Sequence, residues 1–292
     1  MADPYRGIKD FMSGTAGGIT QVLIGMPLDI LKVRLQTTQQ YSGTLDCARK
    51  IYKNEGVMAF YKGTLTPLLG IGVCVSVQFW AFHDVKRRFM AYNDGAYGVE
   101  DLSYNQFYMS GAAAGVASSV ITSPVEQVRI LLQTQPDKGK MLYNGPLDCV
   151  RKISAHQGIA KGVFRGLGVT SVRDAQGYGV WFLTYEFLMR QTVQRGTKRE
   201  DVPTWKLLAY GAIAGEMLWL SSYPLDVVKS RIQADRFAAS RKYYGFLDCA
   251  RKTWIEGGTR AFWKGIVPTA LRATPASAGT FATVELAMRL LG

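Results

Sequence analysis

The sequence predicts an all-α membrane protein built from three copies of one helical unit, and two repeated patterns support this. A Pro-x-acid-x-x-base motif recurs about every hundred residues, at Pro27, Pro124 and Pro224. A Gly-x-x-x-Gly pair precedes each proline at the same offset; the pairs are Gly14 and Gly18, Gly111 and Gly115, and Gly211 and Gly215. Small residues let membrane helices approach closely, whereas prolines inside long helices suit a soluble stack poorly. We therefore favour a membrane bundle over an α-solenoid.

Composition narrows the class of protein. The 292 residues are 48% hydrophobic and 20% charged, with a formal net charge of +13. No run of 18 residues is wholly apolar, but helices that line a water-filled cavity keep polar residues on their inner face. The basic residues do not gather in one run, so we do not expect a nucleic-acid partner. With two histidines and four cysteines, the chain offers no metal or catalytic set, and we expect neither cofactor nor enzyme activity.

The chain divides into three units, residues 1–100, 101–200 and 201–292, which we expect to form one integral domain. Each unit should open with a long helix that continues past its proline. A short amphipathic helix follows after a Tyr-x-Gly step. A second long helix then starts after an aromatic-Lys/Arg-Gly step and ends near residues 90, 192 and 291. Six spans of about 25 to 30 residues are long enough to cross a hydrocarbon core of about 30 Å.

The repeated acids and bases predict a ring of ion pairs. Positions three apart share one face of a helix, so each acid and base can point together to the central axis. The six residues are Asp29, Lys32, Glu126, Arg129, Asp226 and Lys229. Three ordinary pairs within single helices are the alternative. A ring of three pairs is only a few kcal/mol strong, which suits a gate that opens once per cycle.

These motifs resemble the mitochondrial carrier family over the whole chain. The resemblance is nearest to the fungal YMC-type carriers, beside the carnitine/acylcarnitine and basic amino-acid carriers, in segments such as 65–70 and 219–230. It implies six transmembrane helices around a pseudo-threefold axis and three short matrix helices. It also implies a multi-pass monomer of the mitochondrial inner membrane, with both termini in the intermembrane space. The ring would then be the matrix gate.

The resemblance also implies a substrate site on the second long helix of each unit, seven residues after the Lys/Arg-Gly step. The positions are Gly70, Ile71, Arg173, Asp174, Arg272 and Ala273. Asp174 offers a carboxylate to an amine, and the arginines offer planar forks to a carboxylate, although Arg173 and Asp174 could merely neutralise each other. Glu216 is expected to bind a cationic amine, with snorkelling or an inter-helix hydrogen bond as the alternatives. Tyr178, Trp181 and Trp80 could line the cavity, but packing is the more common role.

Two further sites follow from the resemblance. On the cytoplasmic side, Asp84 has Arg87 three residues on, whereas Glu186 and Glu285 have methionines there and an arginine one step further. We therefore expect a weak cytoplasmic gate of Asp84, Arg87, Glu186 and Glu285. The resemblance implies that cardiolipin binds at helix N-termini opened by glycines, which could otherwise serve only as turns. These are Gly43, Gly63, Gly145, Gly166, Gly245 and Gly265.

The sequence thus favours an inner-membrane solute carrier that works by alternating access. The expected solute is a small zwitterion, such as glutamate, glycine or a basic amino acid. The alternatives are a carnitine/acylcarnitine exchanger and a proton-leak protein. The solute itself, uniport versus exchange, the counter-substrate and any coupling to protons or potential are left open.

Overall fold

The computed structural model describes residues 6–97, 102–135, 142–235 and 241–291, with some side chains inside the helices excepted. Within these ranges the chain is helical and has no strand. The long helices are α1 (Arg6–Thr37), α3 (Leu65–Tyr97), α4 (Tyr104–Thr134), α6 (Leu167–Gln194), α7 (Thr204–Ala234) and α9 (Ile266–Leu291). The short ones are α2 (Thr44–Glu55), α5 (Pro146–Gly158) and α8 (Phe246–Ala261). Single turns occupy Val57–Tyr61, Ile159–Val163 and Arg199–Asp201.

The predicted order of a long, a short and a long helix in each repeat is confirmed. Pro27, Pro124 and Pro224 lie inside α1, α4 and α7, which continue past them as expected. The second long helices begin at Leu65, Leu167 and Ile266, directly after or within two residues of the Lys/Arg-Gly step. The helix α3 runs to Tyr97, about seven residues beyond the expected end.

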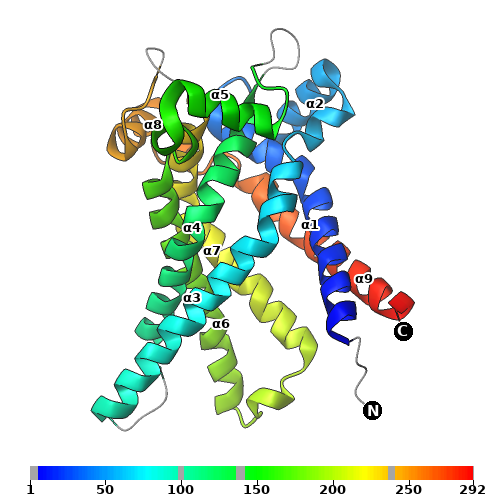
Figure 1. The fold of residues 1–292 in the computed structure, drawn as a ribbon, viewed down its shortest axis with the longest axis vertical. Helices are drawn as coiled ribbons and strands as arrows, with labels where there is room; N and C mark the ends of the chain where they lie inside the picture. Colours follow the sequence, from blue (N-terminus) through cyan, green and yellow to red (C-terminus); the bar gives the residue numbers. More distant parts are fainter. Residues whose placement is uncertain (1–5, 98–101, 136–141, 236–240, 292) are drawn as a thin grey trace.

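The three short helices gather at one end of the molecule, at the top of Figure 1, which we call the short-helix end. One cysteine fastens each short helix to the proline helix of its repeat. Cys47, Cys149 and Cys249 are completely buried, each within its own cluster of apolar side chains. Burial raises the pKa of the Cys47 and Cys149 thiols to about 12. These cysteines therefore act as small core residues.

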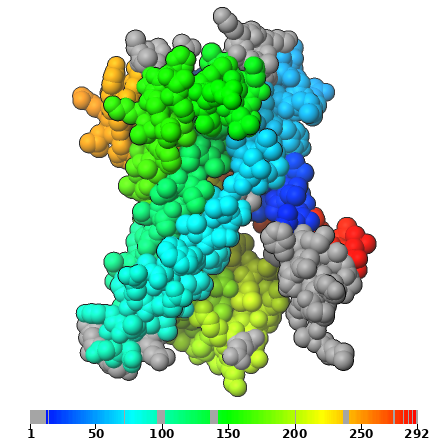
Figure 2. All heavy atoms as spheres, viewed as in Figure 1, coloured from blue at the N-terminus to red at the C-terminus, as the bar shows by residue number. Residues whose placement is uncertain are grey.

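The long helices do not pack with threefold regularity. The helix α4 lies along α6, α3 along α4, α7 along α6, and α1 along α9. By contrast, α1 meets α3, and α7 meets α9, over short stretches only. Figure 1 shows α1 and α3 converging toward the short-helix end and separating below it, and Figure 2 shows the surface hollowed between the cyan α3 and the blue α1.

The expectation that all three Gly-x-x-x-Gly pairs support close packing is wrong for the third repeat and for Gly18 of the first. A Cβ on Gly111 would lie 2.6 Å from the backbone oxygen of Tyr178 on α6, and one on Gly115 would overlap the backbone of Asp174. A Cβ on Gly18, Gly211 or Gly215 would meet nothing within 4 Å. Gly14 lies outside the residues whose surroundings are described. The glycines leave space on one face of the helix, but close packing also requires a neighbouring helix that fills this space.

Apolar composition alone identifies few of the membrane spans. Among the described helices, Thr15–Thr37 is long and apolar enough to cross a membrane, and the bent pair Val57–Gly70 and Gly72–Gly95 would make a second. The other long helices carry polar or charged residues in mid-span, such as Arg173 on α6 and Arg272 on α9. This composition is the one expected of helices around a polar cavity.

Candidate functional site

Six charged side chains meet where the proline helices α1, α4 and α7 converge. They form three ion pairs: Lys32 with Asp226 (2.8 Å), Arg129 with Asp29 (2.6 Å), and Lys229 with Glu126. Each base contacts the acid of a neighbouring proline helix instead of the acid three residues behind it. The pairs therefore join the three helices in a closed cycle, which we call the ring.

The side chains of the ring are not equally buried. The Lys229 and Asp226 side chains are 2% and 5% exposed, whereas the Glu126 side chain is 30% exposed. Removing one partner of a buried pair leaves the other uncompensated and costs about 3–5 kcal/mol, although the intact pair contributes much less. The ring is thus sensitive to damage yet weak enough to be exchanged for other contacts.

A second layer of hydrogen bonds lies at the ends of the same helices and was not predicted. Arg34 Nε donates to the carbonyl oxygen of Gln133 (3.2 Å), and Arg231 Nε donates to that of Gln36 (3.0 Å). Gln127 Nε2 donates to the carbonyl oxygen of Gln233 (3.0 Å). Each bond joins two proline helices, so the ring is backed by a matching cycle of side chain to backbone contacts. Gln36 also donates to Asp226 Oδ2 of the ring (3.0 Å).

A cavity of about 440 Å³ adjoins the ring. Its wall includes all six ring residues and reaches Gln21 on α1 and Gln78 on α3. Gly70, Arg173 and Arg272, three of the predicted substrate contacts, also line it. Side chains from α1, α3, α4, α6, α7 and α9 contribute, so one space is shared by all three repeats.

The two arginines of the cavity contact the ring directly. Arg173 Nη2 lies 3.3 Å from Asp226 Oδ1, while its Nη1 donates to Asp174 Oδ1 at 2.6 Å. Arg272 Nε lies 3.4 Å from Asp29 Oδ1. Both contacts to the ring are longer than a good charge-assisted hydrogen bond, so each arginine fork retains capacity for another anion.

One aromatic ring sits among the cations of the cavity. The Trp219 ring centroid lies 4.1 Å from Lys32 Nζ, 4.8 Å from the Arg173 guanidinium carbon and 5.8 Å from that of Arg272. The negative face of an indole attracts nearby cations, so Trp219 offsets part of the repulsion among these three. Sequence reasoning did not assign Trp219 to the cavity, because the equivalent positions Val22 and Ser119 are not aromatic.

Comparison with known families agrees with this architecture. The sequence model described as "Mitochondrial carrier protein" matches residues 3–93, 100–196 and 200–292, one match for each repeat. The chain belongs to the mitochondrial carrier family. Family membership places this carrier in the mitochondrial inner membrane as a multi-pass protein, with the short-helix end on the matrix side.

Three relatives align over nearly the whole carrier. It is 46% identical to the "Glutamate/glycine mitochondrial carrier ymc1" of Schizosaccharomyces pombe, over 95% of this chain and 92% of that protein. It is 45% identical to the "Mitochondrial glycine transporter YMC1" of Saccharomyces cerevisiae, over 99% and 94%. It is 41% identical to the human "Mitochondrial basic amino acids transporter", over 96% and 89%. The relatives are therefore carriers of small molecules.

The other predicted substrate residues are not part of the described wall of the cavity. Asp174 is buried behind Arg173, where it accepts a hydrogen bond from Thr122 (3.2 Å). Ala273 and Glu216 are partly buried and are not part of the described wall, and the Ile71 side chain lies outside the described residues. Within the described part of the chain, Glu216 forms no ion pair or hydrogen bond. Tyr178 lines the cavity, whereas Trp181 packs on a core cluster and Trp80 is exposed.

Among the described side chains, the predicted cytoplasmic residues Asp84, Arg87 and Glu186 do not meet across the bundle. Asp84 pairs along its own helix with Arg88 (2.8 Å) and Arg87 (3.5 Å). Glu186 pairs with Arg190 (3.1 Å) and with Arg199 (2.9 Å) of the α6–α7 linker. The Glu285 side chain lies outside the described residues. The described cytoplasmic pairs are therefore local, whereas the matrix pairs join different helices.

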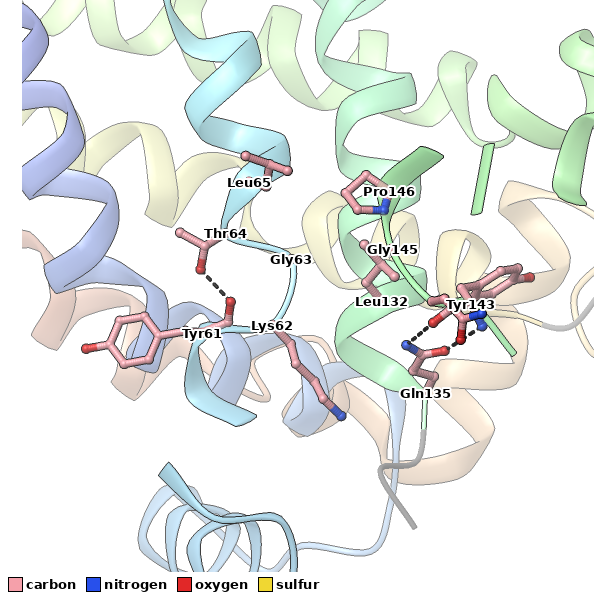
Figure 3. Close-up of a pocket in the computed structure, with 11 residues that line it drawn as sticks. Tyr61, Lys62, Gly63, Thr64, Leu65, Leu132, Gln135, Tyr143, Gly145 and Pro146 are labelled. Carbon is pink, nitrogen blue, oxygen red and sulfur yellow. Dashed lines mark hydrogen bonds between the residues drawn. The ribbon is translucent and has the colours of Figure 1, made fainter. Parts of the chain in front are cut away.

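The predicted lipid-site glycines fall into two structural sets. Gly43, Gly145 and Gly245 precede α2, α5 and α8, and Gly63, Gly166 and Gly265 precede the second long helices. The second set has φ of 76°, 83° and 85°, a left-handed conformation that requires glycine for the turn alone. Gly63 and Gly145 both line a pocket of about 410 Å³ between the first and second repeats (Figure 3).

Proposed function

We propose that this carrier moves a small amino acid across the mitochondrial inner membrane by alternating access, and that the ring is its matrix gate. The contacts of Arg173 and Arg272 with the ring acids carry the proposal. A solute carboxylate that binds the two arginine forks competes with Asp226 and Asp29 for the same cations. Occupancy of the cavity therefore weakens the ring.

The geometry favours a zwitterion over a simple anion. Once the arginines turn to the solute carboxylate, the ring acids and Asp174 become available to an amine. Bound solute can shift a conformational equilibrium only by its differential affinity for the two conformations. A few kcal/mol is enough to change a ring of partly buried ion pairs from mostly closed to mostly open. The predicted contacts Gly70, Ile71, Ala273 and Glu216 would then shape the space around the solute.

The relatives support an amino acid as the solute, because their names give glycine, glutamate and basic amino acids. The test is uptake of labelled glycine, glutamate, arginine and carnitine into proteoliposomes, with and without internal counter-solute. We expect saturable uptake of at least one amino acid, lost in Arg272→Gln. Competition by long-chain acylcarnitine without amino-acid uptake would identify the carnitine exchanger instead. Proton conduction with fatty acid and no solute would identify a leak protein.

A lipid headgroup is the second ligand we propose, at the pocket between the first two repeats. Figure 3 shows the Lys62–Leu65 turn on one side of this pocket and Gly145 and Pro146, at the start of α5, on the other. Two helix N-termini thus face one space, and helix N-termini bind phosphate through free amides. Lys62 also lines this pocket, and its ammonium lies 3.6 Å from Glu55 Oε2. By repeat equivalence, Gly166 with Gly245 and Gly265 with Gly43 would form the matching sites.

Thermal stability in detergent tests the lipid proposal. Added cardiolipin should raise the melting temperature, and Lys62→Gln should reduce this increase, whereas Lys53→Gln on the exposed face of α2 should not. An equal increase with phosphatidylcholine, or no effect of Lys62→Gln, would contradict it. We further propose that the three units 1–100, 101–200 and 201–292 act as one monomeric transport domain without enzyme activity.

A further inference from the structure

Glu186 lies near the cytoplasmic end of α6 and is held by two arginines. Its side chain is 5% exposed. Arg199 donates from Nη1 to Oε1 (3.0 Å) and from Nη2 to Oε2 (2.9 Å), a bidentate contact. Arg190 donates from Nε to Oε1 (3.1 Å). Both oxygens of this carboxylate are therefore engaged, by Arg199 of the linker and by Arg190 of α6.

The two arginines differ in position and in exposure. Arg190 also donates to the carbonyl oxygen of Leu102 (2.6 Å), and its guanidinium lies over the Tyr104 and Phe107 rings. It is fixed to the start of α4. Arg199 lies in the single turn between α6 and α7, and its side chain is 54% exposed. Of the two contacts, the one made by Arg199 is therefore the easier to release.

We propose that Arg199 is a positioning residue that holds Glu186 on the linker while the matrix ring is closed. Release of this contact, which we call the linker clamp, is then a step in closing the cytoplasmic end. This inference rests on the alternating-access function proposed above. The predicted cytoplasmic gate is then weak for two reasons. Arg199, which lies outside the repeat pattern, competes for Glu186, and the second and third repeats lack a base three residues after the acid.

The candidate for a new partner of Glu186 is Arg87 on α3. The Phe82 and Phe182 rings stack with centroids 3.8 Å apart, so α3 and α6 are in contact at this level. Arg87 and Glu186 lie about one turn beyond that stack on their helices. Arg87 is 69% exposed, and its contact with Asp84 is long, at 3.5 Å. Such an exposed ion pair is weak, so Arg87 can exchange Asp84 for another acid at little cost. Transfer of Glu186 from Arg199 to Arg87 would join α6 to α3.

The native Cys74 reports on this step without any knowledge of the solute. It lines the cavity and is partly accessible, whereas the other three cysteines are buried. In mitoplasts that contain the carrier, a membrane-impermeant thiol reagent added from the cytoplasmic side should label Cys74 while that end is open. Cys74→Ser identifies the labelled site. Because this readout needs no transport, it separates failure of the linker clamp from failure of the proposed solute.

Arg199→Gln should slow the labelling of Cys74 about tenfold. The Arg199–Glu186 contact stabilises the conformation that is open to the cytoplasmic side, so its loss shifts the population toward the conformation that is closed there. Arg199→Lys keeps the charge but not the fork and should fall between. Lys198→Gln, the same charge change one residue away, should label like the wild type. Glu186→Gln/Arg199→Gln should restore labelling, because the neutral amide no longer favours closure.

Two outcomes would overturn the linker clamp. One is wild-type labelling in Arg199→Gln. The other is slow labelling that persists in the double variant, which would show that Arg199 acts on the cavity through general folding and not through Glu186.

Discussion

The second repeat packs its two long helices against each other, whereas the first and third repeats leave theirs apart. Polar bonds accompany the α4–α6 contact along its length: Tyr108 donates to Gln176 (2.6 Å), Ser119 lies 2.7 Å from Ser171, and Thr122 donates to Asp174 (3.2 Å). The helices α1 and α3, and α7 and α9, have no comparable run of bonds among the described residues. The repeats are equivalent in sequence pattern but not in packing.

The reason lies on the partner helix. On α6, Gly179 occupies the position that Ser76 holds on α3 and that Ala278 holds on α9. Gly179 lets the ring of Tyr108 approach so closely that a Cβ would lie 2.6 Å from that ring. Glycine on both helices gives backbone contact, whereas glycine on one helix leaves a gap.

At the matrix end, the first and third repeats have polar contacts that the second repeat lacks. In the first and third repeats a buried arginine pairs with a glutamate at the end of the short helix: Arg34 with Glu55, and Arg231 with Glu256 (2.7 Å). The second repeat has Leu131 at the arginine position, within an apolar cluster around Cys149 and Ile153. Thus the repeats with loosely packed long helices fasten their short helices with ion pairs, and the tightly packed repeat uses apolar contact.

Breaking the matrix ion pair of the first repeat should have the largest effect. Glu55→Gln leaves the Arg34 side chain, 6% exposed, without its counter-charge, and should destabilise the carrier by about 3 kcal/mol. The matched change in the second repeat is Gln157→Ala, which removes no charge and should cost less than about 0.5 kcal/mol. Thermal unfolding in detergent with added lipid measures both. Similar losses in the two variants would contradict the proposed difference between repeats.

Filling the glycine contact of the second repeat should have the next largest effect. A Cβ at Gly115 would overlap the Asp174 backbone and lie 2.8 Å from the Ala175 nitrogen, so the helices must separate. Gly115→Ala should cost about 1–3 kcal/mol, the usual range for overpacking. Gly215→Ala, the equivalent change on α7, has open space and should be neutral or slightly stabilising, since alanine favours helix. Equal effects would show that the repeats pack alike.

The matrix pair also predicts a dependence on pH in one direction. Burial raises the pKa of Glu55, but the hydrogen bond and charge of Arg34 outweigh it and hold that pKa below its usual value. Because the folded pKa is the lower one, the stabilisation is present above the unfolded pKa, near 4.3, and is lost as pH falls through the folded value. Thermal unfolding between about pH 6 and 3 should show this loss in the wild type and a smaller one in Glu55→Gln. Equal slopes would exclude Glu55 as the source.

Repetition explains which parts of the site could be predicted from sequence. The helix order and the six ring residues could be predicted because each appears three times at one spacing. Trp219 and Arg199 each occur in one repeat only, so no pattern singled them out. Arg34 and Arg231 occupy equivalent positions in the first and third repeats, but the second repeat has Leu131 there. The arginines are therefore not part of a threefold pattern. The glycines Gly18, Gly211 and Gly215 meet no partner because a motif on one helix does not determine which residues the neighbouring helix presents.

A cross-link within the second repeat should have the smallest effect on transport, because α4 and α6 are expected to move together. The Ser119 and Ser171 hydroxyls lie 2.7 Å apart, so the two side chains point toward each other and are suitable positions for an engineered cysteine pair. In a Cys74→Ser background, oxidised Ser119→Cys/Ser171→Cys should transport at a rate within about twofold of the same protein after reduction, since no bond of the moving interface is restrained. The reduced sample is its own control for the substitutions. A tenfold loss on oxidation would mean that α4 and α6 separate during the cycle, and the tight packing of the second repeat would then describe one conformation of the carrier and not a rigid unit.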